Sequence, residues 1–331
     1  MEIEIVSTHV IIPSSPTPTH LRDHKLSFLD ERIPPSYIPL ILYYNGHKNI
    51  TQSEMCDRLK RSLSDALVRF YPLAGRMNGQ ISVDCNDQGI LYLEAKADGK
   101  ISDIIKSMDS DDHYDFLENL IPFKSNGIKR IEIPSHTKFF HGKTHPSRGF
   151  NSVFVEPLSN RKRGRQFFRC VSSRKLERKI PGVTRNSFGN IYQMARAENV
   201  AGEKNWIILA EKIRDAFGKM DGEYFQELLG EKGFEVAKEN FMGISKYLAL
   251  GNVEVLRFSS FCRLGFYGAD FGWGKPVWVS SGSYGGKDRI FLFDSVEWDG
   301  GIEAWIVLAD QEMERLQQDL EFQHFTSSFA S

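Results

Sequence analysis

Residues 259–276 read SSFCRLGFYGADFGWGKP, and this stretch carries the strongest fold signal in the chain. Gly272 and Gly274 bracket Trp273, and an acidic and an aromatic residue come just before them. Because glycine adopts backbone angles that other residues resist, the pattern predicts a tight loop, which its aromatic side chains anchor. Asp270 is unfavourable in such a loop unless a cationic or hydrogen-bonding group faces it.

The composition around this loop is that of an ordinary globular protein. The chain has 331 residues, of which 41% are hydrophobic and 26% charged, and 24 are phenylalanine. Its length suggests roughly two domains, and its phenylalanine content indicates aromatic cores or pockets. The 42 basic and 43 acidic residues leave a formal charge of -1, which argues against a nucleic-acid-binding protein.

Hydrophobic periodicity predicts a mixture of strands and helices. Strands are predicted at 2–12, 39–44, 90–94, 128–133, 150–155, 166–171, 190–194, 253–258, 277–280, 289–293 and 302–309. Helices are predicted at 51–70, 109–115, 206–220, 223–247 and 311–322, the first of them opening with a capping box of Thr51 and Glu54. Their irregular order predicts an α/β fold with mixed sheets.

The sequence gives little indication of a targeting signal or of paired cysteines. The N-terminus lacks a basic segment followed by a long apolar run, and no stretch approaches the roughly 18 apolar residues of a membrane helix. The four cysteines form no CxxC pair and are expected to be reduced and buried. We therefore expect a cytoplasmic protein with no membrane partner.

Three further segments have competing readings. GSYGGK at 282–287 lacks the spacing of a phosphate-binding loop and predicts a hairpin turn. The basic run at 161–169 is read as a solvated loop, against nucleic-acid binding or nuclear import. His141 and His145, in HGKTH, would share a helical face and bind metal, but the nearby glycine and proline favour a loop without metal.

DFGWG followed by Lys-Pro resembles the signature of the plant BAHD acyltransferases, and other segments extend the resemblance along the chain. PSSPTPTH at 13–20, LSFLD at 26–30, YPLAGR at 71–76, SFGN at 187–190 and DGGIEA at 299–304 are similar to family elements in the family's order. The match is most similar to the vinorine-synthase-like branch, which acylates alcohols of specialised metabolites.

The resemblance implies a two-domain fold like that of chloramphenicol acetyltransferase, with acyl-CoA and acceptor meeting between the domains. It divides this chain into 1–127, an incomplete N-terminal acyltransferase domain, and 128–331, the C-terminal domain that carries DFGWG. It further implies acyl-CoA as co-substrate without a bound cofactor or metal, a small-molecule alcohol or amine acceptor, and a monomer. In the family, the His of an HxxxD motif takes the acceptor's proton.

That motif is missing, since none of the nine histidines has Asp four residues later. IKRIEI at 128–133 resembles the strand that normally follows the HxxxD block, so a contiguous block after residue 127 is interpreted as lost. Loss of a strand predicts unpaired backbone groups and an exposed apolar sheet face. Two hypotheses follow: an acyl-CoA-dependent O-acyltransferase with impaired catalysis, or a non-catalytic remnant or incomplete gene model that binds CoA or a partner without turnover.

The resemblance also assigns roles to the remaining site residues. Ser259 and Phe261 stand where the family has Thr and Trp of a Thr-Ser-Trp segment, so they are candidates for stabilising the oxyanion and lining the pocket. Arg174 is the expected partner of Asp270 in a buried ion pair. The loop itself is expected to be structural, through Asp270, Phe271, Gly272, Trp273 and Gly274.

Overall fold

The computed structural model describes residues 3–31, 39–46, 48–79, 81–106, 135–142, 165–170, 187–189, 194–199, 206–249, 254–281, 288–296 and 301–327. Its largest element is a seven-stranded mixed sheet in the order β14-β7-β13-β12-β10-β8-β9. The strand bounds are Thr326–Ser327 for β14, Ser135–Gly142 for β7, Ile302–Ala309 for β13, Arg289–Asp294 for β12, Glu254–Ser260 for β10, Arg165–Cys170 for β8 and Met194–Asn199 for β9.

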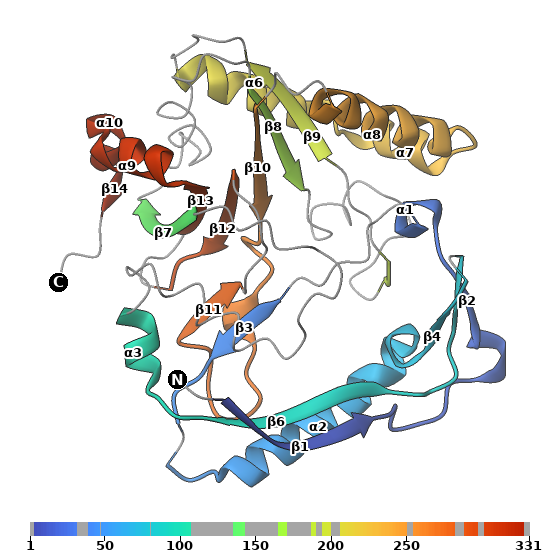
Figure 1. The fold of residues 1–331 in the computed structure, drawn as a ribbon. Helices are drawn as coiled ribbons and strands as arrows, with labels where there is room; N and C mark the ends of the chain where they lie inside the picture. The colour runs from blue at the N-terminus through green and yellow to red at the C-terminus, as the bar shows by residue number, and fades with distance from the viewer. Residues whose placement is uncertain are drawn as a thin grey trace.

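The two faces of this sheet bury different cores. Along β13, Ala304, Ile306 and Leu308 join one core, while Trp305 and Val307 join the other, as the two-residue period of a strand requires. The first core, which we call the helix-side core, takes side chains from the short helix α1 (Phe28–Glu31) and from five longer helices (Figure 1). These are α6 (Trp206–Gly218), α7 (Gly222–Leu229), α8 (Gly233–Ala249), α9 (Asp310–Gln318) and α10 (Leu320–Phe325).

The second core, the aromatic core, lies between the large sheet and a small sheet. The small sheet pairs β3 (Leu40–Tyr43) with β11 (Trp278–Ser281) antiparallel, so segments more than 200 residues apart in the sequence are neighbours. The helix α3 (Ile101–Lys106) also contributes side chains to this core. The buried members of the aromatic core are Tyr43, Trp278, Val279, Phe291, Phe293, Trp305 and Val307.

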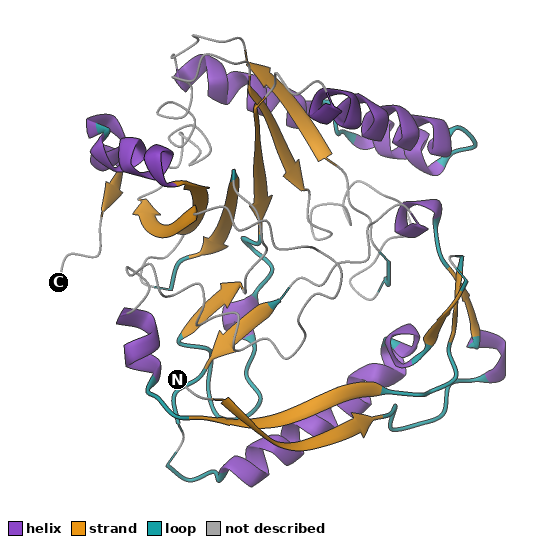
Figure 2. Ribbon diagram, viewed as in Figure 1, coloured by secondary structure: helices purple, strands orange, loops and turns teal. Residues whose placement is uncertain are grey.

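The remaining N-terminal strands lie along the long helix α2 (Gln52–Arg69) and near one end of it (Figure 2). β1 (Ile3–Ile11) pairs with β6 (Ile90–Ala97), and β5 (Ser82–Asp84) lies between β2 (Asp23–Lys25) and β4 (Arg76–Asn78). The short helices are α1 (Phe28–Glu31) and the 3-10 turns η1 (Thr19–Leu21), η2 (Tyr71–Ala74) and η6 (Phe266–Gly268).

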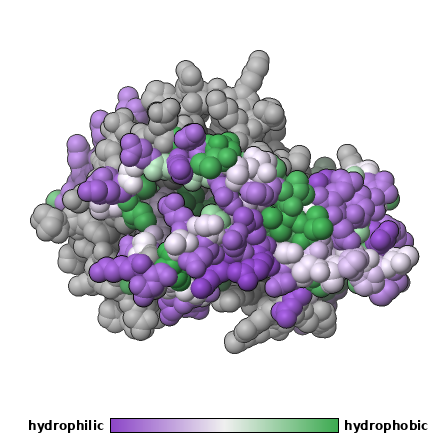
Figure 3. All heavy atoms as spheres, turned by 90° about the horizontal axis from the view of Figure 1, so that it is seen from below, coloured by the Kyte–Doolittle hydropathy of each residue, from purple (hydrophilic) through white to green (hydrophobic). Residues whose placement is uncertain are grey.

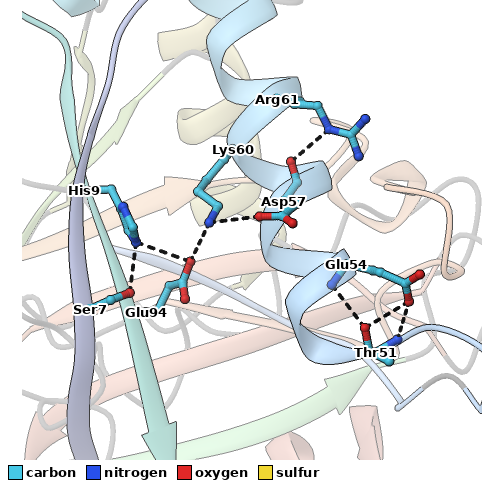
Figure 4. A network of polar contacts seen from close by, with 8 residues as sticks. All are labelled: Ser7, His9, Thr51, Glu54, Asp57, Lys60, Arg61 and Glu94. Carbon is cyan, nitrogen blue, oxygen red and sulfur yellow. Dashed lines mark hydrogen bonds and ion pairs between the residues drawn. The ribbon is translucent and has the colours of Figure 1, made fainter.

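A polar network joins α2 to the β1–β6 ribbon (Figure 4). Lys60 Nζ lies 3.0 Å from Glu94 Oε1 and 3.1 Å from Asp57 Oδ1, and His9 Nε2 lies 3.7 Å from the same Glu94 oxygen. His9 Nε2 also lies 3.0 Å from Ser7 Oγ. Since serine and carboxylate meet the same imidazole nitrogen, this group lacks the relay of a catalytic triad, which uses both ring nitrogens.

The opposite face of the β1–β6 ribbon is apolar and exposed. The register places Val10 opposite Leu91 and Ile5 opposite Ala95, and Val10 and Ile5 are 59% and 55% exposed. Seen from below, the described surface is largely hydrophilic, and its hydrophobic residues gather in separate patches (Figure 3). Contiguous exposed apolar residues of this kind commonly mark an interaction surface or promote aggregation.

The structure also corrects several predicted elements. Of the predicted strand 190–194 the structure describes only Met194, where β9 begins, and helix 223–247 is two helices separated around Gly230. GSYGGK, at 282–287, lies outside the described residues, and of its flanking strands β11 pairs with β3 whereas β12 pairs with β10 and β13. The predicted strands 128–133 and 150–155, the predicted helix 109–115 and residues 161–163 of the basic run lie outside the described residues.

Candidate functional site

The loop over residues 270–274 is organised by one carboxylate and two glycines. Gly272 and Gly274 have φ of +98° and +104°, which favour glycine. These conformations accompany two hydrogen bonds, since Oδ1 of Asp270 accepts from the backbone N–H of Gly272 at 2.7 Å and of Gly274 at 3.0 Å. The same hydrogen bonds lower the pKa of Asp270, because they stabilise its ionised form.

Aromatic side chains dock this loop onto the segment that follows β3. Trp273 is only 9% exposed. The ring of Tyr44 meets those of Phe271 and Trp273 edge-on, each at a centroid distance of 6.1 Å. The Tyr44 hydroxyl donates to the Ala269 carbonyl at 2.9 Å. The predicted apolar anchoring of the loop is therefore present.

The expected environment of Asp270 is partly wrong. The residue is exposed, not buried, because backbone amides of its own loop satisfy the carboxylate and the loop lies at the surface. The predicted ion pair with Arg174 cannot be assigned, since Arg174 lies outside the described residues. A cation does approach the loop from α2, where Arg58 Nη1 donates to the Gly272 carbonyl at 3.4 Å.

Ser259 and Phe261 lie at the end of β10, on the aromatic side of the large sheet. Ser259 is half-buried and pairs in register with Phe291 of β12. Phe261 stacks on Phe293 with ring centroids 5.0 Å apart and planes at 20°. Its backbone N–H donates to the Leu292 carbonyl at 2.7 Å. Both candidate pocket residues therefore lie on the side of the sheet that carries the aromatic core.

The sequence motifs did not indicate a buried carboxylate on that side of the sheet. Glu303, within DGGIEA, is 5% exposed, and the indole N–H of Trp278 donates to its Oε2 at 3.4 Å. Burial and the nearby Glu303 charge raise the pKa of Tyr267. The alternation of charged Glu303 with apolar neighbours along a buried strand was the available sequence signal.

His141 lies in a strand, contrary to the prediction that HGKTH forms a loop. The antiparallel pairing of β7 with β13 places His141 opposite Glu303 and Phe139 opposite Trp305. The ladder extends to residue 142, so the glycine that suggested a loop is its last residue. His145 lies outside the described residues. No cluster of three metal-ligating side chains is found in the part of the chain that the structure describes.

Motifs far apart in the sequence also converge at the edge of the N-terminal region. The His24 ring meets Tyr71, in YPLAGR, and Phe188, in SFGN, at centroid distances of 6.1 and 5.5 Å. A Cβ placed on Gly189 would lie 3.4 Å from the carboxylate of Asp30, in LSFLD. The segments 26–30, 71–76 and 187–189 thus form one structural cluster.

Comparison with families of known proteins gives a match along most of the chain. A model described as Transferase family matches residues 1–135 and 159–323. Stemmadenine O-acetyltransferase from Catharanthus roseus is 30% identical, with 96% of this chain and 97% of that protein covered. Their alignment spans 426 positions against the 331 residues of this chain, so at least 95 positions (426 less 331) have no counterpart here.

Solved structures show the same fold. Vinorine synthase superposes with a TM-score of 0.74 at 23% identity and covers 99% of both chains. TRI101 of F. sporotrichioides, complexed with coenzyme A and T-2, superposes with a TM-score of 0.56 at 15% identity, covering 92% of this chain and 99% of that one.

Proposed function

The chain belongs to the Transferase family, the BAHD acyltransferases that its motifs resemble, and from this premise we propose that it transfers an acyl group from acyl-CoA to a small-molecule alcohol or amine. The observation that carries the proposal is the family match over residues 1–135 and 159–323. The DFGWG loop within it is folded and packs against Tyr44. Coenzyme A in the complex of TRI101 supports the choice of donor.

Two residues beside the aromatic core suit the acceptor step. Phe261 is half-buried, so its ring can contact an apolar acceptor or acyl group while it stacks on the buried ring of Phe293. Ser259, at the end of β10, supplies a hydroxyl that can donate to the oxyanion formed when the acceptor attacks the thioester. The domain division at 127/128, a monomeric state and a cytoplasmic location are parts of the same proposal. No described helix has the length and apolar character to cross a membrane.

Catalysis is proposed to be slower than in relatives that carry HxxxD. General-base catalysis contributes roughly 10²- to 10⁴-fold, and the sequence has no histidine in that motif. The same absence favours the second candidate function, a protein that binds CoA or a partner without turnover.

The two candidate functions are separated by CoA release. The purified chain is incubated with acetyl-CoA and a panel of alcohols and amines, and free thiol is followed with time. Acceptor-dependent release that falls in the Ser259→Ala variant supports acyl transfer. Release no faster than in buffer, with acetyl-CoA binding retained in calorimetry, supports the non-catalytic alternative.

A further inference from the structure

The β1–β6 ribbon has two chemically different faces. Its inner face turns Ser7, His9 and Glu94 toward α2 (Figure 4). The contact is an ion pair, since Glu94 Oε1 lies 3.0 Å from Lys60 Nζ. Successive residues of a strand point to opposite faces, so the intervening residues form an outer face. We call this set the outer strip, and its members are Ile3, Ile5, Thr8, Val10, Leu91, Leu93, Ala95 and Ala97.

A β-bulge keeps the outer strip continuous along β1. Ile5 is paired with Ala95 and Ser7 is paired with Glu94, so Val6 is the extra residue between two paired positions. One extra residue shifts the alternation of side chains by one. Ile5 therefore lies on the outer face although Ser7, two positions later, lies on the inner face.

The outer strip carries no charge and is open to solvent. Val10 is 59% exposed, Ile5 55% and Leu91 45%. The charged and titratable residues of the ribbon all occupy inner-face positions of the register, and they are Glu4, His9, Glu94 and Lys96. Burial of apolar groups is favourable, whereas burial of an unpaired charge is not. The strip therefore suits an occupant whose contacting face is itself apolar and uncharged.

The sizes of the β6 side chains make the outer strip complementary to itself. Along its outer face β6 presents, in order, Leu91, Leu93, Ala95 and Ala97, so one half is large and the other small. A twofold axis at the middle of this series sets Leu91 of one copy against Ala97 of the other, and likewise Leu93 against Ala95. Close packing is achieved when large residues face small ones, and a twofold interface uses the same patch on both copies.

We propose that the outer strip is the docking surface for a second copy of this chain, with the two ribbons stacked face to face and antiparallel. The eight residues of β6 span about 27 Å, and two strands form a face about 10 Å wide. This footprint is well below the roughly 800 Å² that each partner buries in a stable interface. The dimer is therefore weak and dissociates at micromolar concentration, so the monomer of the proposed function is the form present in dilute solution.

The docking surface is tested by sedimentation velocity of the full chain from micromolar to near-millimolar concentration, where a reversible monomer–dimer equilibrium is expected. Val10→Lys places an ammonium in the interface of both copies and is expected to weaken association at least about tenfold. Met77→Lys is the matched control, because Met77 is 60% exposed in β4, and it should associate as wild type does. A wild-type chain that stays monomeric throughout, or equal association of the two variants, would overturn the proposal.

The register of the dimer is tested with changes that keep the outer strip apolar. Ala97→Leu sets two leucines against each other across the axis and is expected to weaken association about tenfold. Leu91→Ala/Ala97→Leu exchanges large and small and should return association to within about threefold of wild type. Both positions are exposed, so circular dichroism spectra and melting temperatures should match wild type.

These changes also separate a second copy from other occupants of the outer strip. A strip that is merely adhesive, or that serves a different apolar partner, gains contact area in Ala97→Leu and would associate more strongly. That result, or species larger than a dimer, would overturn the twofold packing. No readout involves acyl transfer, so the outcome is independent of the proposed function.

Discussion

The backbone conformation of individual glycines decides whether the DFGWG loop forms. Gly272 has a φ of +98°, which a residue with a side chain rarely adopts, and a Cβ added there would lie 2.7 Å from Arg58 Nη1. Gly272→Ala is therefore expected to lower the free energy of unfolding by about 1–3 kcal/mol, as measured by urea denaturation. Gly268→Ala is the matched control in the same segment, because nothing lies within 4 Å of its added Cβ. Equal stability of the two variants would contradict this assignment of strain.

The charge of Asp270 makes the loop sensitive to acid. Its pKa is lowered in the folded chain, first by the Gly272 and Gly274 amides. The ionised carboxylate therefore stabilises the fold above the unfolded pKa of about 3.9, and this contribution is lost as the pH falls through the lower folded value. Wild type should exceed Asp270→Asn in stability at pH 7, with a difference that shrinks below about pH 4. A difference independent of pH would refute this.

Sequence reasoning at this scale recovered the tight loop and the need of Asp270 for a polar partner, but not the partner itself. Side-chain chemistry suggested a cation, whereas backbone amides of Gly272 and Gly274 satisfy Oδ1. Their approach depends on the two positive φ angles, which a residue pattern permits but does not specify.

Among the elements, α2 was predicted most completely, because its signals are local. Thr51 Oγ1 accepts from the Glu54 N–H, and the Glu54 carboxylate accepts from the Thr51 N–H at 2.8 Å. Thr51→Ala is expected to cost about 1 kcal/mol of stability through loss of this cap. Ser53→Ala, an exposed change within the same helix, is the control. Identical melting temperatures for the two variants would contradict the role of the cap.

Strand partners were predicted less well, because pairing depends on distant segments. A glycine-rich segment between two predicted strands suggested a hairpin, yet β11 pairs with β3, more than 200 residues earlier. The position of β7 could not be predicted for the same reason, because residues 135–142 form a strand by pairing with the distant β13.

On the scale of the whole molecule, the β3–β11 pair makes the folding of the N-terminal and C-terminal parts of the chain depend on each other. Tyr43 and Trp278 lie 4.8 Å apart between ring centroids, and the Tyr43 and Ser280 hydroxyl oxygens are 3.1 Å apart in the core. A fragment of residues 128–331 should therefore expose Trp278, with red-shifted tryptophan emission and dye binding. Addition of the 1–127 fragment should reverse both changes. Cooperative unfolding of the C-terminal fragment alone, with buried tryptophan, would argue against this dependence.

Acyl transfer itself is tested most directly by product formation from labelled donor. Acetyl-CoA carrying ¹³C in its acetyl group is incubated with the chain and an alcohol acceptor panel, and products are analysed by mass spectrometry. The account predicts a ¹³C-acetyl ester in an amount equal to the CoA released, with formation that falls in Ser259→Ala because the oxyanion loses a hydroxyl donor. Release of CoA as labelled acetate, or no labelled product with any acceptor, would contradict it.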